Sequence, residues 1–140
     1  MTSNKNALSP QPVPNPNRTA VGTKPQFSHP SEELFARILD FYGLEWDYEP
    51  CTFPLEWDDQ GHVSEAFSPD FYLPGQDLYI ELTTLRPQLS TFKNRRMRRM
   101  QELYPNIQVK LLKRRELRAM MVKYGLSEDA ARISGTRAQE

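Results

Sequence analysis

The hydrophobic and polar positions of this chain predict an ordered alternation of helices and strands from about residue 29 to residue 126. Apolar residues recur every third or fourth position over residues 31–42, the spacing of an amphipathic helix: Leu34, Phe35, Ile38, Leu39 and Tyr42. Gly43 suits the end of this helix. Ser28 and Ser31 both suit its N-cap, and the pattern does not choose between them.

Alternating apolar and polar positions then predict strands at 46–49, 53–57, 63–67, 71–73, 78–83 and 107–112. The first two are candidates for one bent strand. Two more helices are expected over 87–104 and 114–124, and Pro87 suits the first turn of the former. A hairpin followed by strand, helix and strand predicts an α/β (α+β) protein in which helices flank a mixed sheet.

Composition adds boundaries to this pattern. The chain has 140 residues, a prior for one domain, and six of its 12 prolines fall within residues 1–30. We expect a disordered, Pro-rich tail over 1–28, a folded domain over 29–126 and a flexible C-terminal tail over 127–140. The chain lacks a membrane-length apolar run and has a single cysteine, so we expect a cytoplasmic protein with no membrane partner.

The net charge of zero conceals a strong asymmetry. Residues 31–85 hold 13 acids and one base, whereas residues 86–118 hold 11 bases and two acids. A basic stretch of this density is typical of a surface that binds a polyanion. The acidic half needs partial neutralisation to take part in such binding, and a divalent cation is one candidate.

The predicted hairpin places two carboxylates together. With residues 74–77 as its loop, an antiparallel register pairs Phe71 with Ile80 and Asp70 with Glu81. Two acids directly opposite each other lie about 5 Å apart at Cβ, which is unfavourable unless a cation lies between them. Oxygen ligands alone favour Mg²⁺ or Mn²⁺. The alternative is a solvated hairpin face with incidental acids.

A third acid is placed by helical spacing. Glu32 lies three and seven residues before Phe35 and Leu39, at the edge of the apolar stripe, so we expect it to face the sheet. Glu33 falls on the solvated side. An ordinary role for first-turn acids, which favour the helix dipole, explains both residues equally well.

Ser68-Pro69-Asp70, a hairpin, and Glu81-Leu82-Thr83 together resemble the motif of the PD-(D/E)XK nuclease superfamily, which includes restriction endonucleases and archaeal Holliday-junction resolvases. The predicted order over residues 31–112 is similar to the αβββαβ core of that superfamily, here with a C-terminal helix. The motif is short and degenerate, so the resemblance depends on motif and topology together.

The resemblance implies roles for particular residues. Asp70 and Glu81 would be metal ligands, the carbonyl of Leu82 a third ligand, and Glu32 the acid of the first helix. The lysine of the family motif falls at Thr83, which supplies no cation. Some relatives carry this lysine on the following helix, where Lys93 is the natural candidate; the weaker candidates are Arg86 and Gln88.

The implied activity is hydrolysis of DNA phosphodiester bonds by an endonuclease with Mg²⁺ or Mn²⁺ as cofactor. Basic residues would hold phosphates without reading sequence: Arg95, Arg96, Arg98, Arg99, Lys110, Lys113, Arg114 and Arg115. Two alternatives remain open, a noncatalytic nucleic-acid-binding module on the same fold and a protein-interaction domain that uses the basic helix. Because cutting both strands often needs two sites, a homodimer is compatible with this interpretation.

Overall fold

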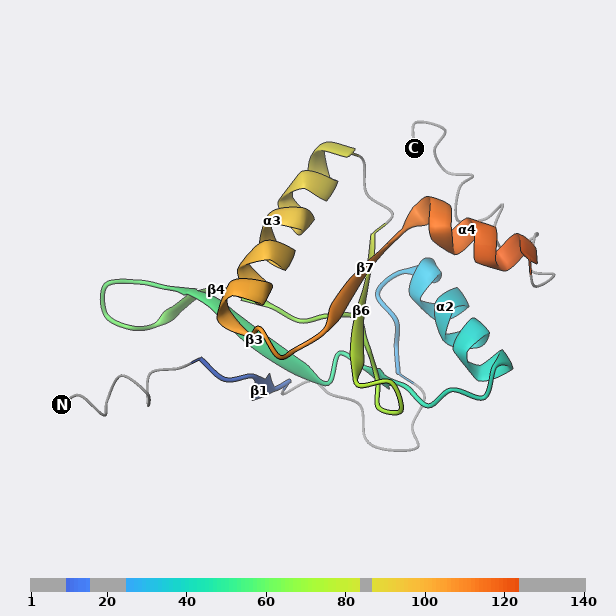
Figure 1. The fold of residues 1–140 in the computed structure, drawn as a ribbon, viewed down its shortest axis with the longest axis horizontal. Helices are drawn as coiled ribbons and strands as arrows, with labels where there is room; N and C mark the ends of the chain where they lie inside the picture. Colours follow the sequence, from blue (N-terminus) through green and yellow to red (C-terminus); the bar gives the residue numbers. More distant parts are fainter. Residues whose placement is uncertain (1–9, 16–24, 84–86, 124–140) are drawn as a thin grey trace.

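The computed structural model describes residues 10–15, 25–83 and 87–123 (Figure 1). The elements in chain order are β1 (Val13–Pro14), α2 (Pro30–Phe41), β2 (Asp47–Tyr48), β3 (Cys51–Trp57), β4 (Val63–Phe67), β5 (Phe71–Leu73), β6 (Leu78–Thr83), α3 (Pro87–Leu103), β7 (Val109–Lys113) and α4 (Arg114–Lys123). The expected α/β class with a mixed sheet is confirmed. None of the described helices is both long and apolar enough to span a membrane.

Two sheets organise these elements. One has the strand order β2-β5-β6-β7, in which the first three strands are antiparallel and β7 runs parallel to β6. The parallel pair is connected through α3, as a β-α-β crossover requires. The other sheet, β1-β3-β4, is antiparallel, and its β3–β4 hairpin projects from the body of the fold (Figure 1).

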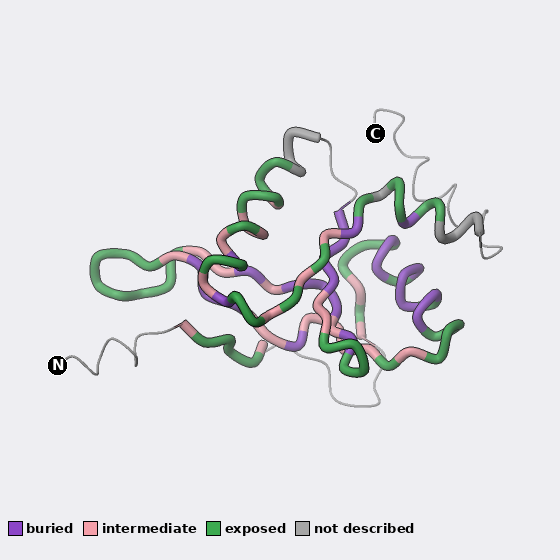
Figure 2. The backbone as a smooth tube through the Cα atoms, viewed as in Figure 1, coloured by how far each residue is buried: buried purple, intermediate pink, exposed green. Residues whose placement is uncertain are grey.

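Alternation along the strands separates two cores. Even-numbered residues of β6, such as Ile80 and Leu82, pack with α2 and α4, whereas Tyr79 faces the core formed by α3, β3 and β4. In Figure 1, α3 accordingly lies on the opposite side of β6 and β7 from α2 and α4. Figure 2 shows buried backbone concentrated in the strands and along one side of α2. The strand β6 is therefore covered on both faces, and its polar residues Glu81 and Thr83 are buried.

Several local expectations differ from the structure. The N-cap of α2 is His29, not Ser28 or Ser31, and its side chain accepts a hydrogen bond from the backbone N–H of Ser31. The segments 46–49 and 53–57 form two strands in different sheets, not one bent strand. The chain turns between them at Glu49, whose φ of 45° lies in the left-handed region.

The segment expected as a disordered tail over 1–28 contributes to the fold at two places. Val13 and Pro14 pair with Thr52 and Cys51 of β3. Phe27 packs among aromatic rings, with its centroid 4.9 Å from that of Tyr48. The polar composition of this segment does not predict either contact. Each contact involves only a few residues, which pack against parts of the chain that are distant in sequence. The expected tail over 127–140 lies outside the described residues.

Candidate active site

The hairpin register brings Asp70 and Glu81 together as predicted. Leu73 pairs with Leu78 and Phe71 with Ile80, so Asp70 and Glu81 are the next opposed positions. The backbone N–H of Leu82 donates to Oδ2 of Asp70 at 2.8 Å, and the N–H of Asp70 donates to Oε1 of Glu81 at 3.2 Å. Each carboxylate is thus anchored by the other strand of the hairpin.

Both carboxylates are buried, with 8% of Asp70 and 6% of Glu81 exposed. Burial raises the pKa of Asp70, and the neighbouring negative charge of Glu81 raises it further. Burial also raises the pKa of Glu81, against the opposing effect of the Lys93 ammonium. The expectation of a solvated hairpin face is therefore wrong at these two positions, because both acids are buried.

Lys93 supplies the cation of the site. Its Nζ lies 2.8 Å from Oε2 of Glu81 and donates to the carbonyl oxygen of Leu82 at 2.7 Å. Thr83, at the position of the family lysine, is buried in β6 and its side chain carries no charge. An ammonium from α3 therefore reaches two groups of β6. Arg86 and the side chain of Gln88 lie outside the described residues.

Glu32 occupies the edge of the same region. It is buried while Glu33 is exposed, as the helical spacing predicts. The hydroxyl of Tyr48 donates to Oε1 of Glu32 at 2.6 Å, and the backbone N–H of Ser28 donates to the same oxygen at 3.1 Å. The charge of Glu32 adds to the upward shift of the pKa of Asp70, which places it within electrostatic reach of the carboxylate pair.

Glu49 and Tyr48 also lie near these acids, although the sequence pattern assigned neither of them a role. The backbone N–H of Glu49 donates to the carbonyl of Asp70 at 2.9 Å. Burial raises the pKa of the Glu49 carboxyl, and the charges of Glu32 and Glu81 raise it further. The available signal was the sequence Tyr48-Glu49-Pro50, in which a strand stops abruptly before a proline.

The oxygen donors fit a hard divalent cation with few protein ligands. Within the described part of the chain, no three His, Cys, Asp or Glu side chains form a group that would hold a metal ion. Magnesium, however, is usually held by one or two carboxylates, with waters and substrate phosphates completing its shell. The Lys93 ammonium shows that Glu81 and the Leu82 carbonyl converge on a single cation position beside Asp70.

Three arginines of α3 contact the β3–β4 hairpin. The Arg95 guanidinium pairs with Glu65 at 3.0 Å, and Arg99 pairs with Glu56 at 2.9 Å. Arg96 donates to the carbonyl of Ala66 at 2.8 Å. These three arginines thus bind the β3–β4 hairpin, and part of the charge asymmetry of the sequence is resolved within the fold.

The remaining basic residues are more open to a partner. Arg98, Lys110, Lys113 and Arg115 are exposed. Lys113 pairs in register with Thr83, so it lies at the same end of the sheet as Glu81. The side chain of Arg114 lies outside the described residues.

Two aromatic residues also differ from expectation. The apolar periodicity of residues 87–104 predicts that Phe92 points inward, and the alternation over 53–57 predicts that Trp57 lies in the core, but both are exposed. Phe92 instead lies beneath two guanidinium groups, 5.2 Å from that of Arg95 and 5.4 Å from that of Arg96. Trp57 is the last residue of β3, toward the projecting tip of the β3–β4 hairpin, where none of the described helices lies over the strands.

Comparison with known proteins adds no family assignment: no family model matches the chain, and neither a curated protein nor a solved structure matches it. Function must therefore be inferred from the geometry of the site and from the motif resemblance.

Proposed function

We propose that this chain is a metal-dependent endonuclease that hydrolyses phosphodiester bonds of DNA. The observation that carries the proposal is the position of the Lys93 ammonium, within 2.8 Å of both Glu81 Oε2 and the Leu82 carbonyl and beside the buried Asp70. Two carboxylates, one carbonyl and one ammonium are the groups that the motif resemblance assigns to such a site. The departure at Thr83 is compensated by a lysine from the next helix.

Asp70, Glu81 and the carbonyl of Leu82 would hold Mg²⁺ or Mn²⁺. When bound, the metal supplies a Lewis acid for the scissile phosphate and lowers the pKa of an attacking water. Lys93 would donate hydrogen bonds to the negative charge that develops on the phosphate. Glu32, fixed by Tyr48 and Ser28, keeps an additional negative charge near the pair.

Nucleic acid would approach over exposed basic side chains of α3, β7 and α4. Arg98, Lys113 and Arg115 are exposed cations that suit phosphate contacts. Arg95, Arg96 and Arg99 retain positive charge near the surface, but their hydrogen bonds are directed to the hairpin. We therefore assign them first to holding the β3–β4 hairpin against α3, and only second to binding DNA.

Nicking of supercoiled plasmid tests the proposal. We expect nicking by the wild type with Mg²⁺, none with EDTA, and loss of at least about 100-fold in Asp70→Asn. Asp59→Asn, which makes the same chemical change on an exposed turn, is the matched control and should nick at the wild-type rate. Equal nicking by wild type and Asp70→Asn would reject the assignment.

Thr83 favours a second candidate, a noncatalytic module that binds nucleic acid on the same fold. The same assay separates the two functions. DNA binding that weakens with salt, without nicking under any divalent metal, would support the binding module. Absence of DNA binding at low salt would instead favour a protein-interaction domain.

A further inference from the structure

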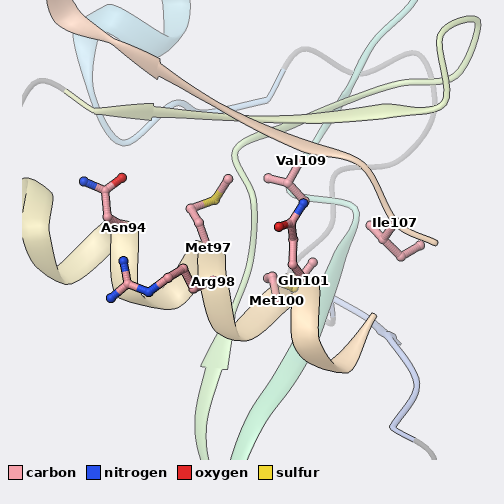
Figure 3. A pocket seen from close by; sticks show the side chains of 7 residues that line it. All are labelled: Asn94, Met97, Arg98, Met100, Gln101, Ile107 and Val109. Carbon is pink, nitrogen blue, oxygen red and sulfur yellow. The ribbon is translucent and has the colours of Figure 1, made fainter. Parts of the chain in front are cut away.

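A concave feature lies between α3 and the segment that leads into β7. It has a volume of about 340 Å³, close to the lower end of the range for small-ligand sites (Figure 3). Its apolar walls include Met97 from α3 and Ile107 and Val109 from the β7 side. In Figure 3, Met97 points from α3 toward the strands. Such a space suits an apolar group of limited size.

Three polar side chains of α3 line the same pocket: Asn94, Arg98 and Gln101. Their spacing of four and three residues places them along one stripe of the helix. All three are exposed, and none of these side chains has a hydrogen bond or ion pair with the residues that the structure describes. Among the described residues, therefore, nothing competes with a ligand for their donors and acceptors.

This contrasts with the neighbouring arginines of the same helix. Arg95, Arg96 and Arg99 are all directed to the β3–β4 hairpin. Arg98 therefore contributes a positive charge to the pocket that no described carboxylate neutralises. Amide and guanidinium groups are the side chains that most often hydrogen-bond base edges and phosphates in DNA.

Two elements that line the pocket also lead to the proposed active site. Asn94 directly follows Lys93, and Met97 lies about one helical turn beyond Lys93, about 6 Å along the axis. On the sheet side, Val109 pairs with Tyr79, two residues or about 7 Å before Glu81. A nucleotide adjacent to a phosphate bound at Lys93 would therefore lie next to this pocket.

We propose that the pocket holds one unpaired base of the DNA strand, adjacent to the scissile phosphate; this inference rests on the proposed nuclease function. A base within a duplex offers only its edge, whereas an unstacked base offers a face to Met97 and Val109 and an edge to the polar stripe. The preferred substrate is then DNA with an unpaired or distorted position.

Binding measured in EDTA, where hydrolysis is blocked, tests this inference. Fluorescence anisotropy would compare a short duplex that has one unpaired base with the same duplex fully paired. We expect the wild type to bind the unpaired form about tenfold more tightly, the scale of one stacked base. The double variant Asn94→Ala/Gln101→Ala, altered only at exposed positions, should lose most of this preference.

A second variant fills the pocket. Met97→Trp should abolish the preference, with circular dichroism and a melting curve used to verify its fold. Equal affinity of the wild type for the two duplexes overturns the inference, as does a preference that persists in both folded variants. Failure to bind either duplex at low salt also overturns it.

The two assays distinguish failure of the base-binding inference from failure of the proposed nuclease function. Mg²⁺-dependent plasmid nicking without a preference for the unpaired base would reject the pocket assignment and keep the nuclease. The preference without nicking under any divalent metal would reject the nuclease and keep the base-binding site.

Discussion

The ammonium of Lys93 lies 2.8 Å from Oε2 of Glu81, although the two residues belong to different elements and are separated by 12 positions. The same ammonium contacts the carbonyl of Leu82. Under the proposed function, Lys93 occupies the place where a divalent cation would contact both oxygens. An ammonium and a metal ion at one position should compete.

Removal of this ammonium should separate metal binding from catalysis. We expect Lys93→Met to bind Mn²⁺ more tightly than the wild type in isothermal titration calorimetry without DNA, since the competing cation is gone. Its plasmid nicking should nevertheless fall by about 100-fold or more, because no donor stabilises the developing charge. Lys110→Met, at an exposed strand position, is the control for Mn²⁺ binding without DNA, which should equal that of the wild type. Weaker Mn²⁺ binding by Lys93→Met would contradict competition at this position.

Much of this arrangement could be predicted from the sequence, because it follows from local rules. The two-residue period of strands and a four-residue loop determine that Asp70 faces Glu81, and the helical period turns Glu32 toward the sheet. The sequence could identify Lys93 only as a candidate, because its contact with Glu81 depends on how α3 packs across the sheet. The pairing of Arg95 and Arg99 with hairpin acids was missed because charge along a sequence does not reveal which elements meet in space.

The hydrogen bond from Tyr48 to Glu32 should contribute measurable stability. Tyr48→Phe leaves a buried carboxylate with one fewer donor, so we expect a loss of about 1.5–3 kcal/mol in the free energy of unfolding. Urea denaturation provides the measurement. Tyr72→Phe is the matched control, because its hydroxyl donates to the exposed Asp77 and its loss should have little effect. A similar small change for both variants would show that the Glu32 contact is energetically unimportant.

Asp70 should make the metal-free fold sensitive to pH. Folding raises the pKa of Asp70 above the value of about 3.9 for an unfolded aspartate, so the fold favours the protonated form. Its contribution to stability is then present below about pH 4 and is lost as the pH rises through the folded pKa.

Asp70→Asn removes this titration and should be more stable than the wild type in EDTA near pH 8, with the difference shrinking toward acidic pH. The amide oxygen of the substituted side chain can still accept the hydrogen bond from the Leu82 N–H. Thermal melts across this pH range measure the difference, with Asp59→Asn as a control that should follow the wild type. A wild-type melting temperature that rises relative to Asp70→Asn with increasing pH would reverse the sign and refute the interpretation.

Substitutions at Arg96 and Arg98 should affect different properties, the stability of the fold and the affinity for DNA respectively. Arg96→Gln loses the bond to the Ala66 carbonyl and the packing of its guanidinium 4.8 Å from the centroid of the Phe67 ring. We expect it to destabilise the fold by about 1–2 kcal/mol in urea denaturation. Arg98→Gln, on the same helix without such contacts, should leave stability unchanged but reduce DNA affinity. Equal stability of the two variants would remove the structural role assigned to Arg96.

The most direct measurement is a lysine exchange between α3 and β6, read out as the rate of Mg²⁺-dependent plasmid nicking. Position 83 shares the sheet face of Glu81, so a lysine there can reach the space that Lys93→Met vacates. We predict that the wild type nicks, that Lys93→Met does not, and that Thr83→Lys/Lys93→Met regains at least about a tenth of the wild-type rate. Nicking by Lys93→Met at the wild-type rate, or none by the wild type itself, would contradict the assignment of this site as a nuclease centre.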